Sequence, residues 1–186
     1  MSEQPQLLTL RAAQLAAELH QDQRRKGASK RPYINHPLEV AQRLAEVAEV
    51  TDAEVLAAAL LHDTVEDTTA TAEDILEAFG PKVAALVAEV TDDKSLEKAE
   101  RKQQQVEHAP HLSADAAAIK ISDKTSNVLD LVRDPPPDWS YTRLVGYLDW
   151  AERVVGAIEH PHPALRQHFH AAIAAGRAAL PGGDDG

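Results

Sequence analysis

The stretch Leu60-Leu61-His62-Asp63-Thr64-Val65-Glu66-Asp67 ends a segment that is strongly apolar from residue 55 onward. The apolar run predicts a helix over about residues 51–66 that is buried in the core, opened by the capping box Thr51-Asp52-Ala53-Glu54. Ionisable side chains at the end of a buried helix are costly unless they have partners. The stretch therefore predicts a helical core with a polar site at its edge.

Within this helix, residues four apart share a face, so we expect His62 to lie above Glu66 and Asp63 above Asp67. Each column then joins one residue of metal-ligand type to one of acid or base type. We interpret the upper pair, His62 and Asp63, as able to hold a cation and the lower pair, Glu66 and Asp67, as able to hold a water. His-Asp dipeptides also occur by chance, so this interpretation depends on the rest of the chain.

The composition is helical. The 186 residues include 33 alanines and 20 leucines but eight glycines and seven aromatic residues, which favours an all-α fold. Apolar spacing, caps and prolines predict further helices over about residues 5–24, 37–47, 71–79, 81–90, 113–132, 139–159 and 163–180. No internal linker interrupts them. We expect one compact domain over residues 1–180 and a flexible tail over residues 181–186.

Charge and cysteine content exclude several classes of protein. The formal net charge of −11 opposes approach to nucleic acid or to an anionic membrane, so we expect neither as a partner. The absence of cysteine excludes disulfides, thiolate nucleophiles and Cys-type metal sites, and suits a reducing compartment. No apolar run approaches the roughly 20 residues that span a bilayer, and the N-terminus lacks the order of a signal peptide. We expect a cytoplasmic protein; the sequence leaves its oligomeric state open.

A second polar motif lies inside an apolar helix. In Ile119-Lys120-Ile121-Ser122-Asp123-Lys124-Thr125-Ser126-Asn127 the side chains of Asp123 and Asn127 are four residues apart and share a face. His36 precedes Pro37 at another helix start. The chain thus offers two imidazoles and two carboxylates, from His36, His62, Asp63 and Asp123. This mixed set suits Mn²⁺, with Fe²⁺ or Zn²⁺ as alternatives on ligand type alone.

Basic side chains are concentrated near His36. Residues 22–43 contain six basic and two acidic side chains, whereas residues 44–93 contain thirteen acidic side chains and one basic. The basic segment either binds a polyanion or is an ordinary solvated loop. Lys94, Lys98 and Arg101 form a second basic series, which either clamps distal phosphates or makes surface ion pairs with Glu97 and Glu100.

These motifs together resemble the HD-domain hydrolases of the RelA/SpoT superfamily, and among them the small stand-alone alarmone hydrolases of the metazoan SpoT type. The resemblance covers about residues 8–155. Its segments occur in the same order and with compatible spacing: Arg25-Lys26, Pro32-Tyr33-Ile34-Asn35-His36-Pro37, Ala59 to Thr68, Val90 to Lys94, and Lys120 to Lys124 with Asn127.

The resemblance implies an HD-domain helical fold that binds one Mn²⁺ and removes the 3′-pyrophosphate from (p)ppGpp, releasing GDP or GTP. His36, His62, Asp63 and Asp123 match the family's metal ligands. Glu66 and Asp67 match its catalytic acidic pair, which activates and orients water. The residues that match its substrate-binding positions are Arg25, Lys26, Asn127 and Tyr147; Lys98 joins them as a candidate for the distal phosphates.

Several alternatives stay open. The nucleotide is either a guanine or an adenine alarmone, (p)ppApp; a third activity is removal of the 2′-phosphate of NADPH. A non-enzymatic alternative is a metal-binding helical module that senses nucleotides, which would not need the acidic pair of Glu66 and Asp67. Two departures from the family pattern bear on substrate choice: the loop Gly27-Ala28-Ser29-Lys30-Arg31 is unusually basic, and Leu129 replaces a frequent arginine.

Overall fold

The protein is all-α, as predicted. The structure is a computed structural model that describes residues 4–180; the predicted tail over residues 181–186 lies outside this range. Within it, one isolated bridge pairs Arg24 with Pro32 and no strand forms. The helices are α1 (Pro5–Leu19), α2 (Asn35–Val47), α3 (Ala53–Leu61), α4 (Thr64–Asp67), α5 (Ala72–Val90), α6 (Lys98–His108), the 3₁₀ turn η1 (Ala109–His111), α7 (Ala114–Arg133), α8 (Tyr141–Ala157) and α9 (Pro163–Ala179).

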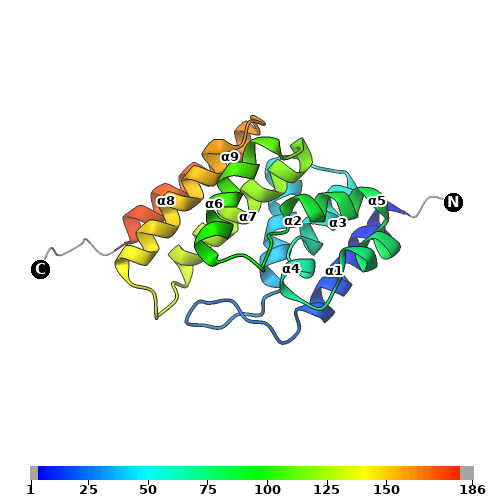
Figure 1. The fold of residues 1–186 in the computed structure, drawn as a ribbon, viewed down its shortest axis with the longest axis horizontal. Coiled ribbons are helices and arrows are strands. Elements are labelled where there is room, and N and C mark those ends of the chain that lie inside the picture. Colours follow the sequence, from blue (N-terminus) through cyan, green and yellow to red (C-terminus); the bar gives the residue numbers. More distant parts are fainter. Residues whose placement is uncertain (1–3, 181–186) are drawn as a thin grey trace, which may run out of the picture.

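Helix α7 runs through the middle of the molecule and packs against α2, α5, α8 and α9 (Figure 1). Its residues from Ala116 to Ser126 are all buried, including three charged ones, Lys120, Asp123 and Lys124. Small side chains permit this close packing. Small side chains also allow α1 to pack against α3, where Ala12 and Ala16 of α1 are buried.

Most predicted helix boundaries are confirmed to within a turn, but several differ. α1 ends at Leu19 rather than near residue 24, because the polar residues that follow have no apolar face to bury. The third helix is capped by Asp52, whose side chain accepts from Glu54 N, rather than by Thr51. The segment after Glu97, predicted only as a charged stretch, forms α6.

The break predicted between residues 79 and 81 is present as a kink. Gly80 has φ 83° and ψ 174°, a conformation that favours glycine, and Pro81 restarts the helix. Thr71 and Asp74 form a reciprocal capping box at the start of α5.

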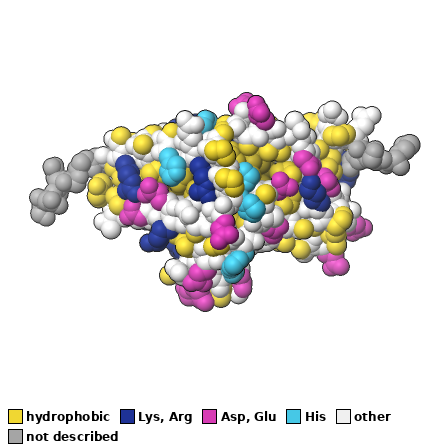
Figure 2. Space-filling view, turned by 90° about the horizontal axis from the view of Figure 1, so that it is seen from above, with side chains coloured by type: hydrophobic (Ala, Val, Ile, Leu, Met, Phe, Trp, Pro, Cys, Tyr) yellow, Lys and Arg dark blue, Asp and Glu magenta, His cyan; other side chains and the backbone are white. Residues whose placement is uncertain are grey.

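On the surface drawn in Figure 2, acidic and basic side chains are interspersed among apolar ones, and no continuous basic surface covers that face. Among the helices in the described part of the chain, none is both long and apolar enough to cross a membrane.

Candidate metal centre and active site

The predicted continuous helix over residues 51–66 is interrupted, and this prediction is wrong. His62 is the C-cap of α3 and Asp63 the N-cap of α4. Thr64 Oγ1 lies 2.7 Å from Leu61 O, and His62 Nδ1 lies 2.7 Å from Ala59 O, so side chains take up carbonyls near the break. In a continuous helix adjacent side chains diverge by about 100°. The break instead lets His62 and Asp63 converge on one point.

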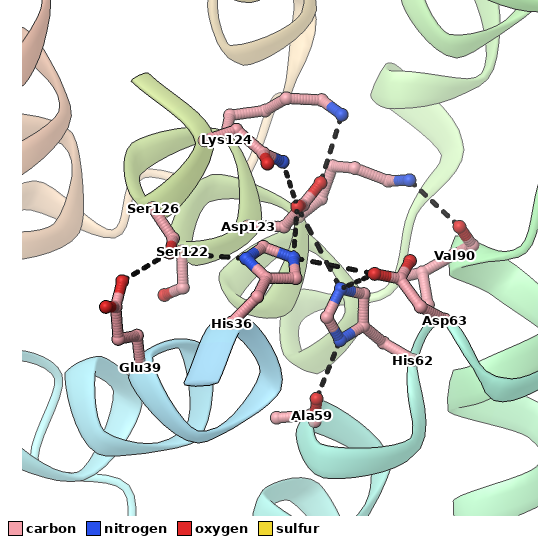
Figure 3. A network of polar contacts seen from close by, with 12 residues as sticks. His36, Glu39, Ala59, His62, Asp63, Val90, Ser122, Asp123, Lys124 and Ser126 are labelled. Atoms are coloured by element: carbon pink, nitrogen blue, oxygen red, sulfur yellow. Dashed lines mark hydrogen bonds and ion pairs between the residues drawn. The ribbon is translucent and has the colours of Figure 1, made fainter. Parts of the chain in front are cut away.

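Four predicted ligands meet at that point from three parts of the chain (Figure 3). His36 Nε2, near the start of α2, lies 3.2 Å from Asp123 Oδ1 of α7 and 3.5 Å from Asp63 Oδ2. His62 Nε2 lies 3.1 Å from Asp63 Oδ2 and 3.9 Å from Asp123 Oδ1. One ligand atom from each of His36, His62 and Asp123 lies within 4.8 Å of the others.

The chemistry of this cluster fits a divalent cation. A carbonyl only accepts, so Ala59 O fixes a proton on His62 Nδ1. His62 Nε2 on the other side of the ring is buried and makes no hydrogen bond, although Asp63 lies close to it. A buried polar atom without a hydrogen bond indicates a missing partner. Two imidazole nitrogens and two carboxylate oxygens are ligands for Mn²⁺, Fe²⁺ or Zn²⁺.

The electrostatics of the cluster also favour a cation. Burial by itself would lower the pKa of His62, but the carboxylates of Asp63 and Asp123 outweigh it and raise this pKa to about 9. Burial would raise the pKa of both carboxyls. The His62 and His36 rings hold the pKa of Asp63 well below its usual value, and Lys124 together with His36 does the same for Asp123. The cluster therefore attracts positive charge, either a proton or a metal ion.

Two contacts to these carboxylates come from residues that the sequence analysis did not single out as site residues. Tyr33 donates its hydroxyl to Asp63 Oδ2 at 2.6 Å, and Lys124 Nζ donates to Asp123 Oδ2 at 3.0 Å. Both lie inside the motifs that carry the family resemblance. Tyr33 lies close in sequence to His36, and Lys124 follows Asp123, so this proximity could have indicated a role at the site.

The predicted acidic pair lies on α4 beside the metal centre. Glu66 Oε2 accepts from the backbone N–H of Asp92 at 3.1 Å, and Arg101 Nη1 lies 3.8 Å from Glu66 Oε1. Burial, followed by the negative charge of Asp92, raises the pKa of Glu66 to about 7. Asp67 forms an ion pair with Lys94. A carboxyl that titrates near neutral pH is suited to proton transfer.

A cavity of about 430 Å³ opens above these groups, within the size range of small-ligand sites. Ten of the eleven predicted site residues line it: Arg25, Lys26, His62, Asp63, Glu66, Asp67, Lys98, Asp123, Asn127 and Tyr147. The exception is His36, which is buried behind the cavity wall.

The wall facing the acidic pair is basic. Burial, followed by the nearby charges of Lys98 and Arg25, lowers the pKa of Lys26, so several cations crowd together there. Arg143, Arg101 and Lys102 also line the cavity. In the second basic series, Lys98 and Arg101 line the cavity. Lys94 pairs with Asp67, and Arg101 lies close to Glu66.

Arg25 is held from two sides. Its Nε donates to Asp130 Oδ2 at 2.7 Å, and its Nη2 donates to Asn127 Oδ1 at 2.7 Å. Asn127 Nδ2 in turn donates to Asp123 Oδ1 at 2.6 Å. Arg25 therefore contacts a predicted metal ligand through one intervening side chain, in addition to lining the cavity.

The basic loop over residues 27–31 contacts the C-terminal half of α7. Arg31 Nη2 donates to Asp130 Oδ1 at 2.7 Å, and Ser29 donates to the carboxylate of Asp134. Arg31 and Ser29 of the loop therefore bind acidic side chains at the C-terminal end of α7, Asp130 and the C-cap Asp134.

Aromatic side chains form the far end of the cavity. Tyr147 lies between Trp139 and Trp150, with ring centroids 5.7 Å and 5.3 Å away. All three rings line the cavity; Trp150 is buried and donates to Lys102 O at 2.9 Å, while Tyr147 and Trp139 remain partly exposed.

The helical fold and the cluster of two histidines and two aspartates, with His62 and Asp63 at the break between α3 and α4, define the class of protein. The HD domain profile matches residues 12–143, and the chain belongs to the HD domain family.

Within this family the similarity extends to small hydrolases. The guanosine-3′,5′-bis(diphosphate) 3′-pyrophosphohydrolase MESH1 of Xenopus tropicalis is 54% identical over 158 residues, covering 85% of this chain and 88% of that protein. The human protein of the same name is 49% identical over 166 residues, covering 89% and 92%. A solved structure described as "A metazoan ortholog of SpoT hydrolyzes ppGpp and plays a role in starvation responses" matches with a TM-score of 0.89 and 42% identity, covering 96% of this chain and all of that chain.

Proposed function

We propose that this chain is a metal-dependent hydrolase that removes the 3′-pyrophosphate of (p)ppGpp-type nucleotides, producing GDP or GTP and pyrophosphate. The observation that carries the proposal is the convergence of His36, His62, Asp63 and Asp123 beside Glu66, at the floor of a cavity with a basic wall. The named activity of relatives about half identical over most of both chains supports this substrate class.

The proposed cofactor is one Mn²⁺ per chain, held by the four ligands. When bound by His36, His62, Asp63 and Asp123, a divalent ion would lower the pKa of water and offset negative charge on the phosphoryl oxygens. The carboxylates that raise the pKa of His62 would then face the cation instead of a proton.

Glu66 is the proposed base. Its pKa of about 7 leaves a large fraction of the carboxylate ionised at neutral pH, and the ionised form can accept a proton from the attacking water. The N–H of Asp92 fixes Oε2 at 3.1 Å, which limits the directions in which Glu66 can point. Asp67, anchored by Lys94, lies one residue further along α4 and is proposed to orient the water. In the net reaction, water adds across the bond between phosphorus and the ribose 3′ oxygen.

Lys26 and Lys98 are proposed to bind the remaining phosphates. Each presents an ammonium group to the cavity. Burial, followed by repulsion from Lys98 and Arg25, lowers the pKa of Lys26, and a phosphate placed there would offset that repulsion. Tyr147 is proposed to pack against the nucleoside, because its ring lies at the aromatic end of the cavity. Asn127 and Arg25 are proposed to hold Asp123 as well as line the substrate site.

The proposal also covers the domain organisation, the location and the partners of the enzyme. We infer one HD-domain unit over residues 1–180 in the cytoplasm, with a hyperphosphorylated purine nucleotide as its ligand and neither nucleic acid nor membrane as a partner. The net charge of −11 supports the last point, since nine of the nineteen Lys and Arg residues line the cavity.

The decisive experiment supplies purified protein with Mn²⁺ and, in separate reactions, ppGpp, ppApp and NADPH, and resolves the products by ion-exchange chromatography. GDP with pyrophosphate is the expected result. ADP with pyrophosphate as the main product would reassign the base, and orthophosphate with NADH would reassign the reaction. No turnover of any of the three would overturn the enzyme proposal.

Two variants separate metal binding from chemistry. Asp63→Ala is expected to lose both bound metal and turnover. Glu66→Gln, which is similar in shape, is expected to keep the metal and to lose about 10²-fold to 10⁴-fold in rate. A Glu66→Gln enzyme with wild-type turnover would contradict the role of Glu66 as the base.

A further inference from the structure

A second hydrogen-bond chain meets His36 on the side of its ring that faces away from the metal centre. Ser126 Oγ of α7 lies 3.2 Å from His36 Nδ1. The same hydroxyl donates to Glu39 Oε2 at 2.8 Å (Figure 3). Ser126 has no exposed surface and His36 is only 2% exposed, so water does not compete at the imidazole end of this chain.

The hydroxyl proton decides the direction of both hydrogen bonds. A carboxylate only accepts, and a serine hydroxyl has one proton. Because that proton is donated to Glu39, the oxygen of Ser126 presents lone pairs to His36. The contact at 3.2 Å is therefore a hydrogen bond only if His36 Nδ1 carries a proton. In a neutral ring, Nε2 is then left with its lone pair.

Glu39 is kept in place by its own surroundings. It lies one helical turn after His36 on α2, so the two side chains share a face. Arg31 Nη1 and Arg133 Nη1 lie 3.6 Å and 3.7 Å from Glu39 Oε1. These guanidinium groups engage one carboxylate oxygen and leave the other to accept from Ser126.

We infer that Glu39 and Ser126 are positioning residues that hold the proton of His36 on Nδ1 and thereby aim the Nε2 lone pair at the metal centre. The ring nitrogen of a ligand histidine that is free to bind metal is set by the hydrogen bond that the other ring nitrogen makes. Loss of such a hydrogen-bond partner commonly lowers metal affinity tenfold to a hundredfold. This relay, the hydrogen-bond chain from Glu39 through Ser126 to His36, rests on the proposed metal site but does not depend on which nucleotide is hydrolysed. His62 needs no such pair, because a backbone carbonyl performs the same task.

The test measures metal binding to the metal-free protein, without substrate. Calorimetric titration with Mn²⁺ is expected to show an affinity about tenfold to a hundredfold lower for Ser126→Ala. Ser122→Ala is the matched control: Ser122 is equally buried, lies one turn earlier on α7, and its hydroxyl has no hydrogen-bond partner within the described structure. Its affinity is expected to stay within about twofold. Glu39→Ala, at the more exposed end of the relay, is expected to lose about threefold to tenfold.

A spectroscopic measurement keeps the inference testable if Ser126→Ala does not fold. Nitrogen-15 NMR of histidine-labelled, metal-free wild-type protein, at a pH where the ring is neutral, is expected to show the His36 proton on Nδ1. Glu39→Ala is expected to reduce that tautomer, because the freed hydroxyl proton of Ser126 can then turn toward Nδ1. A wild-type His36 protonated on Nε2, or a folded Ser126→Ala protein with unchanged affinity, would overturn the inference. Because the readouts are affinity and tautomer, a failure of the proposed hydrolase activity would not be mistaken for either result.

Discussion

Tyr33 donates its hydroxyl to Asp63 Oδ2 over 2.6 Å, across 30 positions of sequence. Burial and the facing Asp63 carboxylate raise the pKa of Tyr33 well above its usual value, so the phenol keeps its proton and remains a donor. The segment from Tyr33 into the first turn of α2 thus supplies both a predicted ligand, His36, and the hydrogen bond that orients another, Asp63.

Replacement of Tyr33 by phenylalanine tests this arrangement. The ring and its packing stay, but Asp63 loses a donor that fixes its carboxylate. Affinity for Mn²⁺ is expected to fall about tenfold, the lower end of the usual range for contacts that orient a ligand. Calorimetric titration measures the change. Tyr141→Phe, on the exposed N-terminal turn of α8, is the control, and equal affinities for the two variants would contradict the role of Tyr33.

The pH dependence of turnover tests the environment of Glu66. This carboxyl, with a pKa of about 7, is neutral below that pH and ionised above it. A base must be ionised, so kcat/KM is expected to rise with pH along an acidic limb. Burial and the Asp92 charge both raise this pKa, so Asp92→Asn removes one cause and lowers it. The limb is expected to move to lower pH, with higher kcat/KM at pH 6 than in the wild type and little change at pH 8.5.

The comparison is made at saturating Mn²⁺, since a divalent cation beside Glu66 would lower the pKa of its carboxyl. Glu66→Gln supplies the control because it removes the titrating group. A limb that stays at the same pH in Asp92→Asn, or that persists in the residual activity of Glu66→Gln, would show that another group controls it.

The sequence predicted which side chains meet more reliably than how the backbone brings them together. Periodic apolar positions and prolines located the helices, because these signals are local. The break at His62 was not predicted, since its cause is the competition of the Thr64 hydroxyl and the His62 ring for backbone carbonyls. Periodicity carries no sign of that competition. The predicted ligands do converge in the structure, but His62 and Asp63 were placed together on a continuous helix that the structure does not have.

Contacts between distant segments were the second limit. Arg25 was predicted as a substrate contact, yet its guanidinium also spans to Asp130 and Asn127, over 100 positions away. Asp92 lies within the segment Val90 to Lys94 of the family resemblance, but its role was not predicted, although its backbone and charge both act on Glu66. Such partners depend on tertiary packing, which one sequence does not specify.

Two glycines provide a stability test of the loop before α2. A Cβ on Gly27 would meet Asp134 Oδ2 at 2.1 Å and its backbone oxygen at 2.4 Å, so Gly27→Ala forces the loop away from α7. A loss of about 1–3 kcal/mol in the free energy of unfolding is expected, as for other overpacked sites. Gly146 on α8 has open space around a Cβ, and Gly146→Ala is expected to stabilise by about 0.5–1 kcal/mol. Chemical denaturation measures both; the same sign for the two would contradict the packing argument.

The basic wall of the cavity should act on substrate rather than on metal. Lys98 lines the cavity, and its charge lowers the pKa of the neighbouring Lys26, so the two ammonium groups repel each other until an anion lies between them. Lys98→Ala is expected to reduce kcat/KM for ppGpp by roughly fivefold to tenfold, mainly through KM, because an exposed charge–phosphate contact is partly screened by solvent. Mn²⁺ affinity is expected to stay unchanged. Lys82→Ala, which removes the same charge from a lysine paired with Asp52 away from the cavity, is the control. Steady-state kinetics at low and moderate salt measure the change. Equal kcat/KM in the two variants would contradict this role of Lys98, as would a loss of kcat/KM in Lys98→Ala that does not shrink when salt is added.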